Sequence, residues 1–103
     1  MKVDLINKCN ILATEYDSLL GEYVEKLSEP VDCRIIYKVN KIIDLRGEES
    51  ISSIKVILPK NIDIAAEYKI MIDNKNYEIR NISYKQNLKG SLEYILVYVW
   101  WNR

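Results

Sequence analysis

Residues 68–101 read YKIMIDNKNYEIRNISYKQNLKGSLEYILVYVWW, and this stretch decides the fold class. Apolar and polar residues alternate on both sides of the polar segment at residues 73–76, which is typical of a β-hairpin. Further along, the apolar alternation shifts by one residue, which indicates a β-bulge near Arg80 or Asn81. Because bulges curl a sheet, the pattern predicts a small antiparallel β-barrel.

The last strand of this stretch, residues 92–101, is apolar on both of its faces. A small monomeric barrel needs only one apolar face per strand, so the second face must be covered by another element or another subunit. Tryptophan is a favoured anchor at protein interfaces. We therefore expect the chain to form an oligomer, with an interface made of Ile95, Val97, Val99, Trp100 and Trp101.

The N-terminal third has a different pattern. Between residues 5 and 27, apolar residues recur at intervals of three and four, which predicts a long amphipathic helix, with Gly21 as its weak point. Pro30 ends this element. The fold expected is therefore α+β: an N-terminal helical arm over residues 1–30 and a mostly antiparallel five-stranded β-barrel over residues 31–103.

Two strands are expected between the helix and the hairpin, near residues 33–40 and 54–58. The segment between them, residues 41–53, is half charged and longer than a hairpin requires, so we expect a long mobile loop there.

Composition excludes several classes of function. The 15 basic and 15 acidic residues cancel, and the chain has no histidine, which removes the commonest general base and zinc ligand. Cys9 and Cys33 alone cannot complete a tetrahedral metal site, and we expect both to be core residues. The catalytic and nucleotide-binding motifs are absent, so we expect a protein that is not an enzyme and takes no cofactor or metal.

The lengths of the apolar runs and the residues at the start of the chain bear on membrane association and secretion. No apolar run approaches the roughly 18–20 residues that span a bilayer, so we expect no membrane association. The start of the chain has Asp4 where a signal peptide would be apolar, so we expect no secretion signal. Residues 1–32 hold seven acids and three bases, which makes the expected helix acidic.

An alternative interpretation is a small barrel that binds single-stranded nucleic acid or a peptide. Tyrosines that stack on bases, interleaved with basic side chains, are typical of such barrels. The candidates are Tyr37, Tyr68, Tyr77, Tyr84, Tyr94 and Tyr98, with Lys38, Lys69, Arg80 and Lys85.

Residues 68–98 resemble the C-terminal half of tailed-phage head–tail joining proteins, which include head-completion (stopper) and adaptor proteins. The shared pattern is a strand, a short polar turn, the sequence YEI followed closely by another isoleucine, a polar loop and an apolar strand. Residues 33–58 resemble the two preceding strands of these proteins. The long acidic arm departs from the shortest members of the family.

The resemblance implies a structural virion protein, present in the host cytoplasm during assembly, that forms a homo-oligomeric ring below the portal. Its implied partners are further copies of itself, portal, adaptor and tail proteins, and packaged double-stranded DNA. The loop at residues 41–53 would help close the DNA channel through Lys41, Arg46, Glu48 and Glu49. The helix would contact an adjoining ring through Glu15, Asp17, Glu22 and Glu25. A tail-completion or tail-terminator ring protein is an alternative that shares the barrel and the ring.

Overall fold

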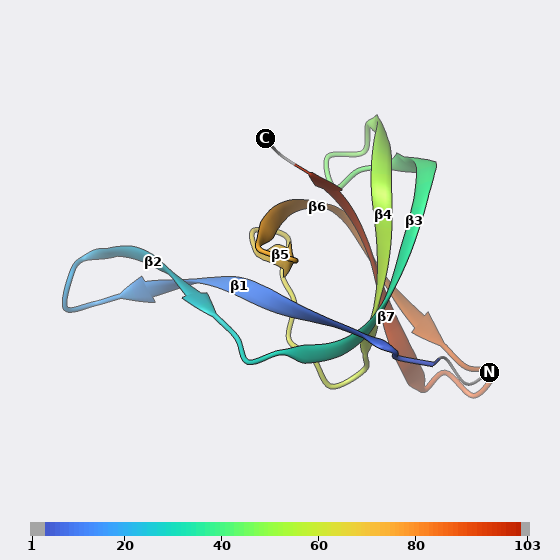
Figure 1. Cartoon of the computed structure of the whole chain (residues 1–103), viewed down its shortest axis with the longest axis horizontal. Helices are drawn as coiled ribbons and strands as arrows, with labels where there is room; N and C mark the ends of the chain where they lie inside the picture. Colours follow the sequence, from blue (N-terminus) through green and yellow to red (C-terminus); the bar gives the residue numbers. More distant parts are fainter. Residues whose placement is uncertain (1–3, 102–103) are drawn as a thin grey trace.

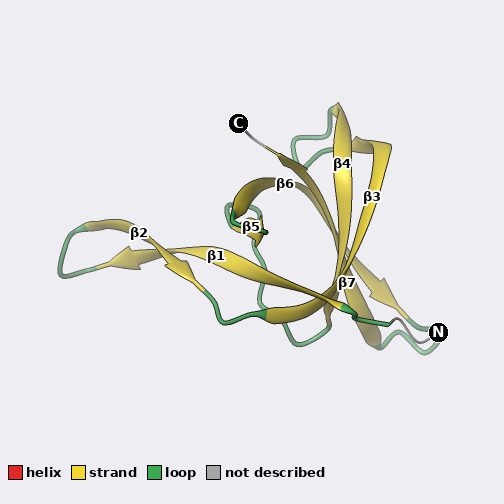
Figure 2. Ribbon diagram, in the orientation of Figure 1, coloured by secondary structure: helices red, strands yellow, loops and turns green. Residues whose placement is uncertain are grey.

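The structure, a computed structural model, describes residues 4–101 and contains seven β-strands and no helix in that range (Figure 1, Figure 2). The strands run antiparallel to their neighbours and are joined by turns or loops. Their bounds are β1 (Asn7–Asp17), β2 (Glu22–Leu27), β3 (Val31–Ile43), β4 (Glu49–Pro59), β5 (Lys69–Ile72), β6 (Lys75–Gln86) and β7 (Leu92–Trp101).

Six of the strands form a closed barrel. The sheet order is β2-β1-β3-β4-β7-β6-β5, and an additional pairing between β1 and β5 closes the ring of strands. Closure gives the backbone donors and acceptors a partner strand on both sides where these pairings overlap, which removes the free edges there.

Strand β1 has three successive partners. Asn7–Cys9 pair with β3, Asn10–Leu12 pair with β5, and the pairing from Leu12 to Asp17 is with β2. The strand therefore leaves the barrel near Leu12 and continues outward as half of a β-hairpin. We call residues 13–27 the arm; it extends away from the barrel along the long axis of the molecule (Figure 1).

The core lies inside the barrel and is aliphatic. Cys33, Val56, Leu58, Ile70, Val97 and Val99 have no exposed surface, and Cys9, Ile54, Ile72 and Ile95 are almost as deeply buried. Burying this apolar surface is the main favourable contribution to folding. Cys9 and Cys33 are core residues, as the sequence predicts.

The predictions drawn from residues 68–101 are confirmed locally. Asp73 and Asn74 connect β5 to β6 with positive φ angles of 50° and 63°, which asparagine and aspartate tolerate better than most residues. The register of β6 against β7 shifts between Ile79 and Asn81, where the bulge is predicted. The last strand spans Leu92–Trp101, and the prediction of a β-barrel is confirmed.

The predicted N-terminal helix and the five-stranded barrel are wrong. Residues 7–27 form β1 and β2, and the N-terminal part of the expected helical arm is a barrel strand, which brings the barrel to six strands. Gly21, expected as a weak point in the helix, instead has a φ of +68° in the turn between β1 and β2. Glycine adopts such a φ readily, whereas a helix requires a negative one.

The long loop expected at residues 41–53 is also not observed. Strand β3 continues to Ile43 and β4 begins at Glu49, so only residues 44–48 form the connection. The charged residues of the segment do not prevent strand formation. Residues 40–43 of β3 pair with residues 49–52 of β4 and extend the hairpin.

The side chain of Ile95 is 1% exposed, whereas that of Ile6, in the segment before β1, is 72% exposed. We expect Ile95→Ala to lower the free energy of unfolding by about 2–5 kcal/mol, because it leaves a cavity in the core. Ile6→Ala, the matched control, should change it by less than about 0.5 kcal/mol. Urea unfolding followed by tryptophan fluorescence measures both; equal effects would contradict the assigned core.

Candidate functional site

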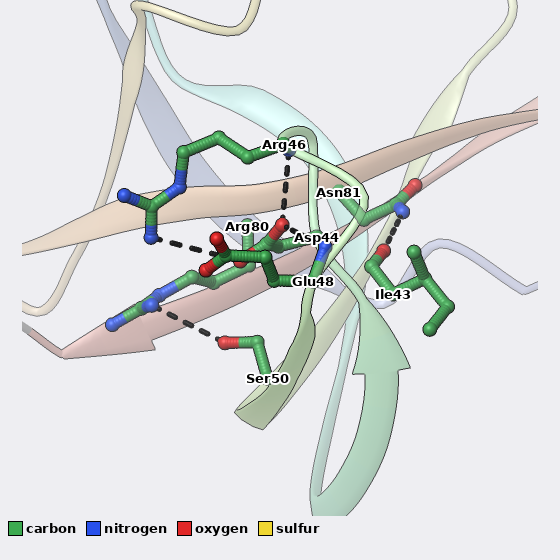
Figure 3. Close-up of polar contacts among 7 residues, drawn as sticks. All are labelled: Ile43, Asp44, Arg46, Glu48, Ser50, Arg80 and Asn81. Atoms are coloured by element: carbon green, nitrogen blue, oxygen red, sulfur yellow. Dashed lines mark hydrogen bonds and ion pairs between the residues drawn. The ribbon is translucent and has the colours of Figure 1, made fainter.

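The β3–β4 turn is organised by the carboxylate of Asp44 (Figure 3). Its Oδ1 accepts hydrogen bonds from the backbone N–H of Arg46 at 2.9 Å and of Glu48 at 3.0 Å. The N–H of Asp44 donates to the carbonyl of Glu48 at 2.8 Å, and the N–H of Gly47 donates to the carbonyl of Asp44 at 3.0 Å. Asp44 is buried, so one carboxylate fixes the turn from inside.

Strand β6 holds the same turn from the side. The N–H of Leu45 donates to the carbonyl of Arg80 at 3.0 Å. Figure 3 shows a second contact, in which Nδ2 of Asn81 donates to the carbonyl of Ile43. The side chain of Arg80 donates from Nη1 to Oγ of Ser50 at 3.2 Å. The turn is therefore tied to β6 at the bulge and is not the free loop that the sequence predicts.

Electrostatics reinforce the turn. The hydrogen bond from the Glu48 N–H, followed by the one from the Arg46 N–H and by the positive charges of Arg46 and Arg80, lowers the pKa of Asp44 below its ordinary value of 3.8. Partial burial acts in the opposite direction and is outweighed. Asp44 is therefore ionised at neutral pH, and its charge stabilises the turn.

The four predicted channel residues lie together around this turn. Arg46 and Glu48 are in the turn, Lys41 is near the end of β3 and Glu49 begins β4, and all four side chains are exposed. The guanidinium of Arg46 is 3.7 Å from the Asp44 carboxylate and remains 75% exposed. The structure thus gathers these residues at one end of the β3–β4 hairpin; that they face DNA stays a prediction.

The four acidic residues assigned to the expected helix lie on the arm. Glu15 and Asp17 are on β1, and Glu22 and Glu25 are on β2. The Asp17 carboxylate accepts hydrogen bonds from the backbone N–H of Leu19 at 2.9 Å and of Leu20 at 3.3 Å, which orders the tip.

The arm also exposes apolar side chains that the sequence predicts to lie on the apolar face of a helix. Tyr16 and Tyr23 face each other across the two strands with ring centroids 5.2 Å apart, and they are 59% and 72% exposed. At the tip, Leu19 is 95% exposed. A signal for this hairpin is present in the sequence, since Tyr16 and Tyr23 flank the segment Asp17–Glu22, which ends in Gly21-Glu22.

Ser28 fixes the base of the arm to the barrel. Its N–H donates to the carbonyl of Ile11 at 2.8 Å, and its Oγ accepts from the N–H of Ile11 at 2.9 Å. Nδ2 of Asn10 donates to the Ser28 carbonyl at 3.0 Å. Lys69 of β5 adds an ion pair with Glu25 at 3.4 Å, so the arm leaves the barrel in a defined direction.

The predicted subunit interface on β7 requires a correction. Ile95, Val97 and Val99 point into the barrel and have at most 1% of their surface exposed, so they are part of the chain's own core. Trp100 is 36% exposed and lies 6.0 Å from the Arg80 guanidinium, a cation–π contact. The side chain of Trp101 lies outside the part of the chain that the structure describes.

Two grooves lie near the turn and the arm. A groove of about 290 Å³ lies beside the β3–β4 turn, between Asp44–Arg46 and Glu78–Arg80. A second groove of about 290 Å³ lies at the base of the arm, lined by Ala13, Lys26 and Tyr68 among others. Within residues 4–101, no three potential ligands come together to hold a metal ion. The same range holds no helix long and apolar enough to cross a membrane.

Cys9 and Cys33 contact each other in the core as free thiols. A hydrogen bond to Cys33 and burial together raise the pKa of the Cys9 thiol well above its usual range. The same hydrogen bond acts in the opposite direction on Cys33 and lowers its pKa. Because both thiols are buried in the core, reagents in solution do not reach them while the chain is folded.

No family model, curated protein or solved structure matches this chain.

Because the pKa of Asp44 is lowered by folding, its contribution to stability is present above the ordinary pKa of 3.8 and is lost as the pH falls through the lower folded value. We expect Asp44→Asn to be less stable than the wild type at pH 7, with the difference shrinking below about pH 4. Urea unfolding from pH 7 to pH 2 measures this. Asp63→Asn, an exposed control, should not reproduce it; a difference that is constant with pH would contradict the assigned role.

We expect the thiols of Cys9 and Cys33 to react with a disulfide reagent such as DTNB at pH 8 only as fast as the protein opens. In 6 M guanidinium both should react at once, because unfolding removes the burial that raises the Cys9 pKa. Rapid labelling of both thiols in the native protein would contradict their place in the core.

Proposed function

We propose that this chain is a structural subunit of a phage head–tail connector that assembles into a ring below the portal and helps to close the DNA channel. The observation that carries the proposal is the arm, a hairpin that leaves a closed barrel and exposes both apolar side chains and acidic ones. Exposed apolar residues of this kind are typical of surfaces that meet other subunits. The resemblance of residues 68–98 to head–tail joining proteins supports the same assignment.

The arm is the element that contacts other subunits of the connector, in the same ring or in the adjoining one. It reaches beyond the barrel in a molecule 45 Å long and 27–28 Å wide. An isolated two-stranded hairpin is only marginally stable in water, so an exposed one gains from a partner. Its acidic residues Glu15, Asp17, Glu22 and Glu25 favour partners with a basic surface.

In this proposal the β3–β4 turn faces the DNA channel. The exposed charges around it are mixed: Lys41 and Arg46 are basic, and Glu48 and Glu49 are acidic. A ring lined only by basic side chains would hold DNA through many phosphate contacts and hinder its passage. Asp44 and β6 keep the turn in place, which suits a fixed constriction better than a moving gate.

Single-stranded nucleic-acid binding is a second candidate, favoured by Tyr37 and Tyr84, which are 67% and 54% exposed. Stacking on such rings contributes about 1–3 kcal/mol per base. Tyr77, in contrast, is 7% exposed and belongs to the core, so the tyrosine series of the sequence does not form one platform. The zero net charge also disfavours this candidate.

We expect light scattering and electron microscopy to reveal discrete closed rings, either from the chain alone at high concentration or after mixing with portal complexes. A strict monomer under both conditions would contradict the proposal. Fluorescence anisotropy with a labelled oligonucleotide tests the second candidate. Tight, salt-sensitive binding that is lost in Tyr37→Ala and Tyr84→Ala, without ring formation, would favour it instead.

A further inference from the structure

Strands β2 and β3 each have an edge, or part of one, with which no strand pairs within residues 4–101. Strand β2 pairs with β1 on one side and with no strand on the other. Strand β3 pairs with β1 only over Val31–Cys33, so no strand pairs with its edge away from β4 from residue 36 to residue 42. At the end of this edge, the carbonyl of Ile43 accepts a hydrogen bond from Nδ2 of Asn81. Unpaired edges present rows of N–H and C=O groups that can accept another strand.

The two edges are opposite in charge. The arm, residues 13–27, carries four acids and one base, for a net charge of −3. Residues 34–43 of β3 carry Arg34, Lys38 and Lys41 and no acid, for a net charge of +3. Opposite charges on adjacent strands stabilise their pairing, whereas like charges destabilise it.

Both edges are also flanked by exposed apolar side chains. On the arm these are Tyr23 and Leu27, which are 72% and 52% exposed. On β3, Val39 and Ile43 are 69% and 54% exposed. Pairing the strands would cover side chains on both partners, as strand addition does in other protein complexes.

One molecule cannot bring its own two edges together. The arm leaves the barrel on one side, whereas β3 begins near the base of the arm and curves away to the opposite side (Figure 1). Ser28 and the Lys69–Glu25 ion pair hold the arm in that direction. A head-to-tail contact between different surfaces of two copies generates a closed ring or an open filament.

We propose that the β2 edge of the arm adds to the free edge of β3 in a second copy of this chain, so that the sheet continues from one subunit to the next. The proposal rests on the proposed function, since it names the contact that builds the ring. We infer antiparallel addition with Glu22 opposite Lys41, which places β2, six residues long, against residues 36–41 of the β3 edge.

Charge reversal tests this contact in the full-length chain by sedimentation velocity. We expect Glu22→Lys and Lys41→Glu each to weaken self-association by about threefold to tenfold. The chain that carries both reversals should regain most of the affinity, because the two edges are again opposite in charge. A merely structural role for either residue would not produce this rescue. Circular dichroism checks that each variant is folded.

Truncating the apolar side chains gives a second measure. Tyr23→Ser combined with Leu27→Ser should reduce association by at least tenfold, because exposed aromatic and aliphatic residues contribute most at such contacts. Tyr84→Ser is the matched control, since Tyr84 is 54% exposed but lies on β6. It should leave association unchanged.

Cross-linking locates the contact directly. Glu22→Cys and Lys41→Cys proteins, made separately and mixed, should form a mixed disulfide dimer, while neither alone should do so efficiently. Cys9 and Cys33 are buried and do not compete. Association that survives the reversals and the Tyr23/Leu27 truncation would overturn the arm contact and leave the ring proposal standing. Cross-linked open fibres would keep the contact and overturn the closed ring, and a chain that never associates would overturn both.

Discussion

The pairing of β1 with both β3 and β5 is the constraint on which the rest of the structure depends. Asn7–Cys9 and Asn10–Leu12 close the barrel from its two sides, which removes the edges of both neighbours over that length. Closure encloses the aliphatic core, and Cys9 and Ile11 contribute to it from β1 itself. Because β1 is longer than the barrel wall, its remainder projects from the molecule and requires β2 as a partner.

The C-terminal half of the fold could be predicted because its signals are local. The Asp73-Asn74 turn favours positive φ angles, and the shift in alternation near Arg80 reflects a register shift between two neighbouring strands. Each of these features depends on only a few adjacent residues. Even here, the sequence predicts an interface at Ile95, Val97 and Val99, which in fact face the core. The sequence of one strand does not show how many other strands pack against its inner face.

The N-terminal half could not be predicted, because β1 changes partner along its length. Cys9 and Ile11 face the barrel interior in strand alternation, but beyond Leu12 the same strand has no core to face. Tyr16 and Tyr23 are then exposed on the arm, and their spacing with Leu12, Leu19 and Leu27 imitates a helical stripe. The candidate site was found only in part: Lys41, Arg46, Glu48 and Glu49 do lie together, but the unpaired edges of β2 and β3 depend on long-range pairing.

The continuity of β1 from barrel wall to arm has a mechanical consequence. Ladder hydrogen bonds in an antiparallel sheet run perpendicular to the strands. A pull along the arm therefore loads the bonds of β1 with β3 and β5 in shear, all together, rather than peeling them one at a time. Tension applied at the far end of the hairpin is thus carried into the wall of the barrel by a single unbroken strand, and the arm resists extraction with the strength of the seam that holds the barrel shut.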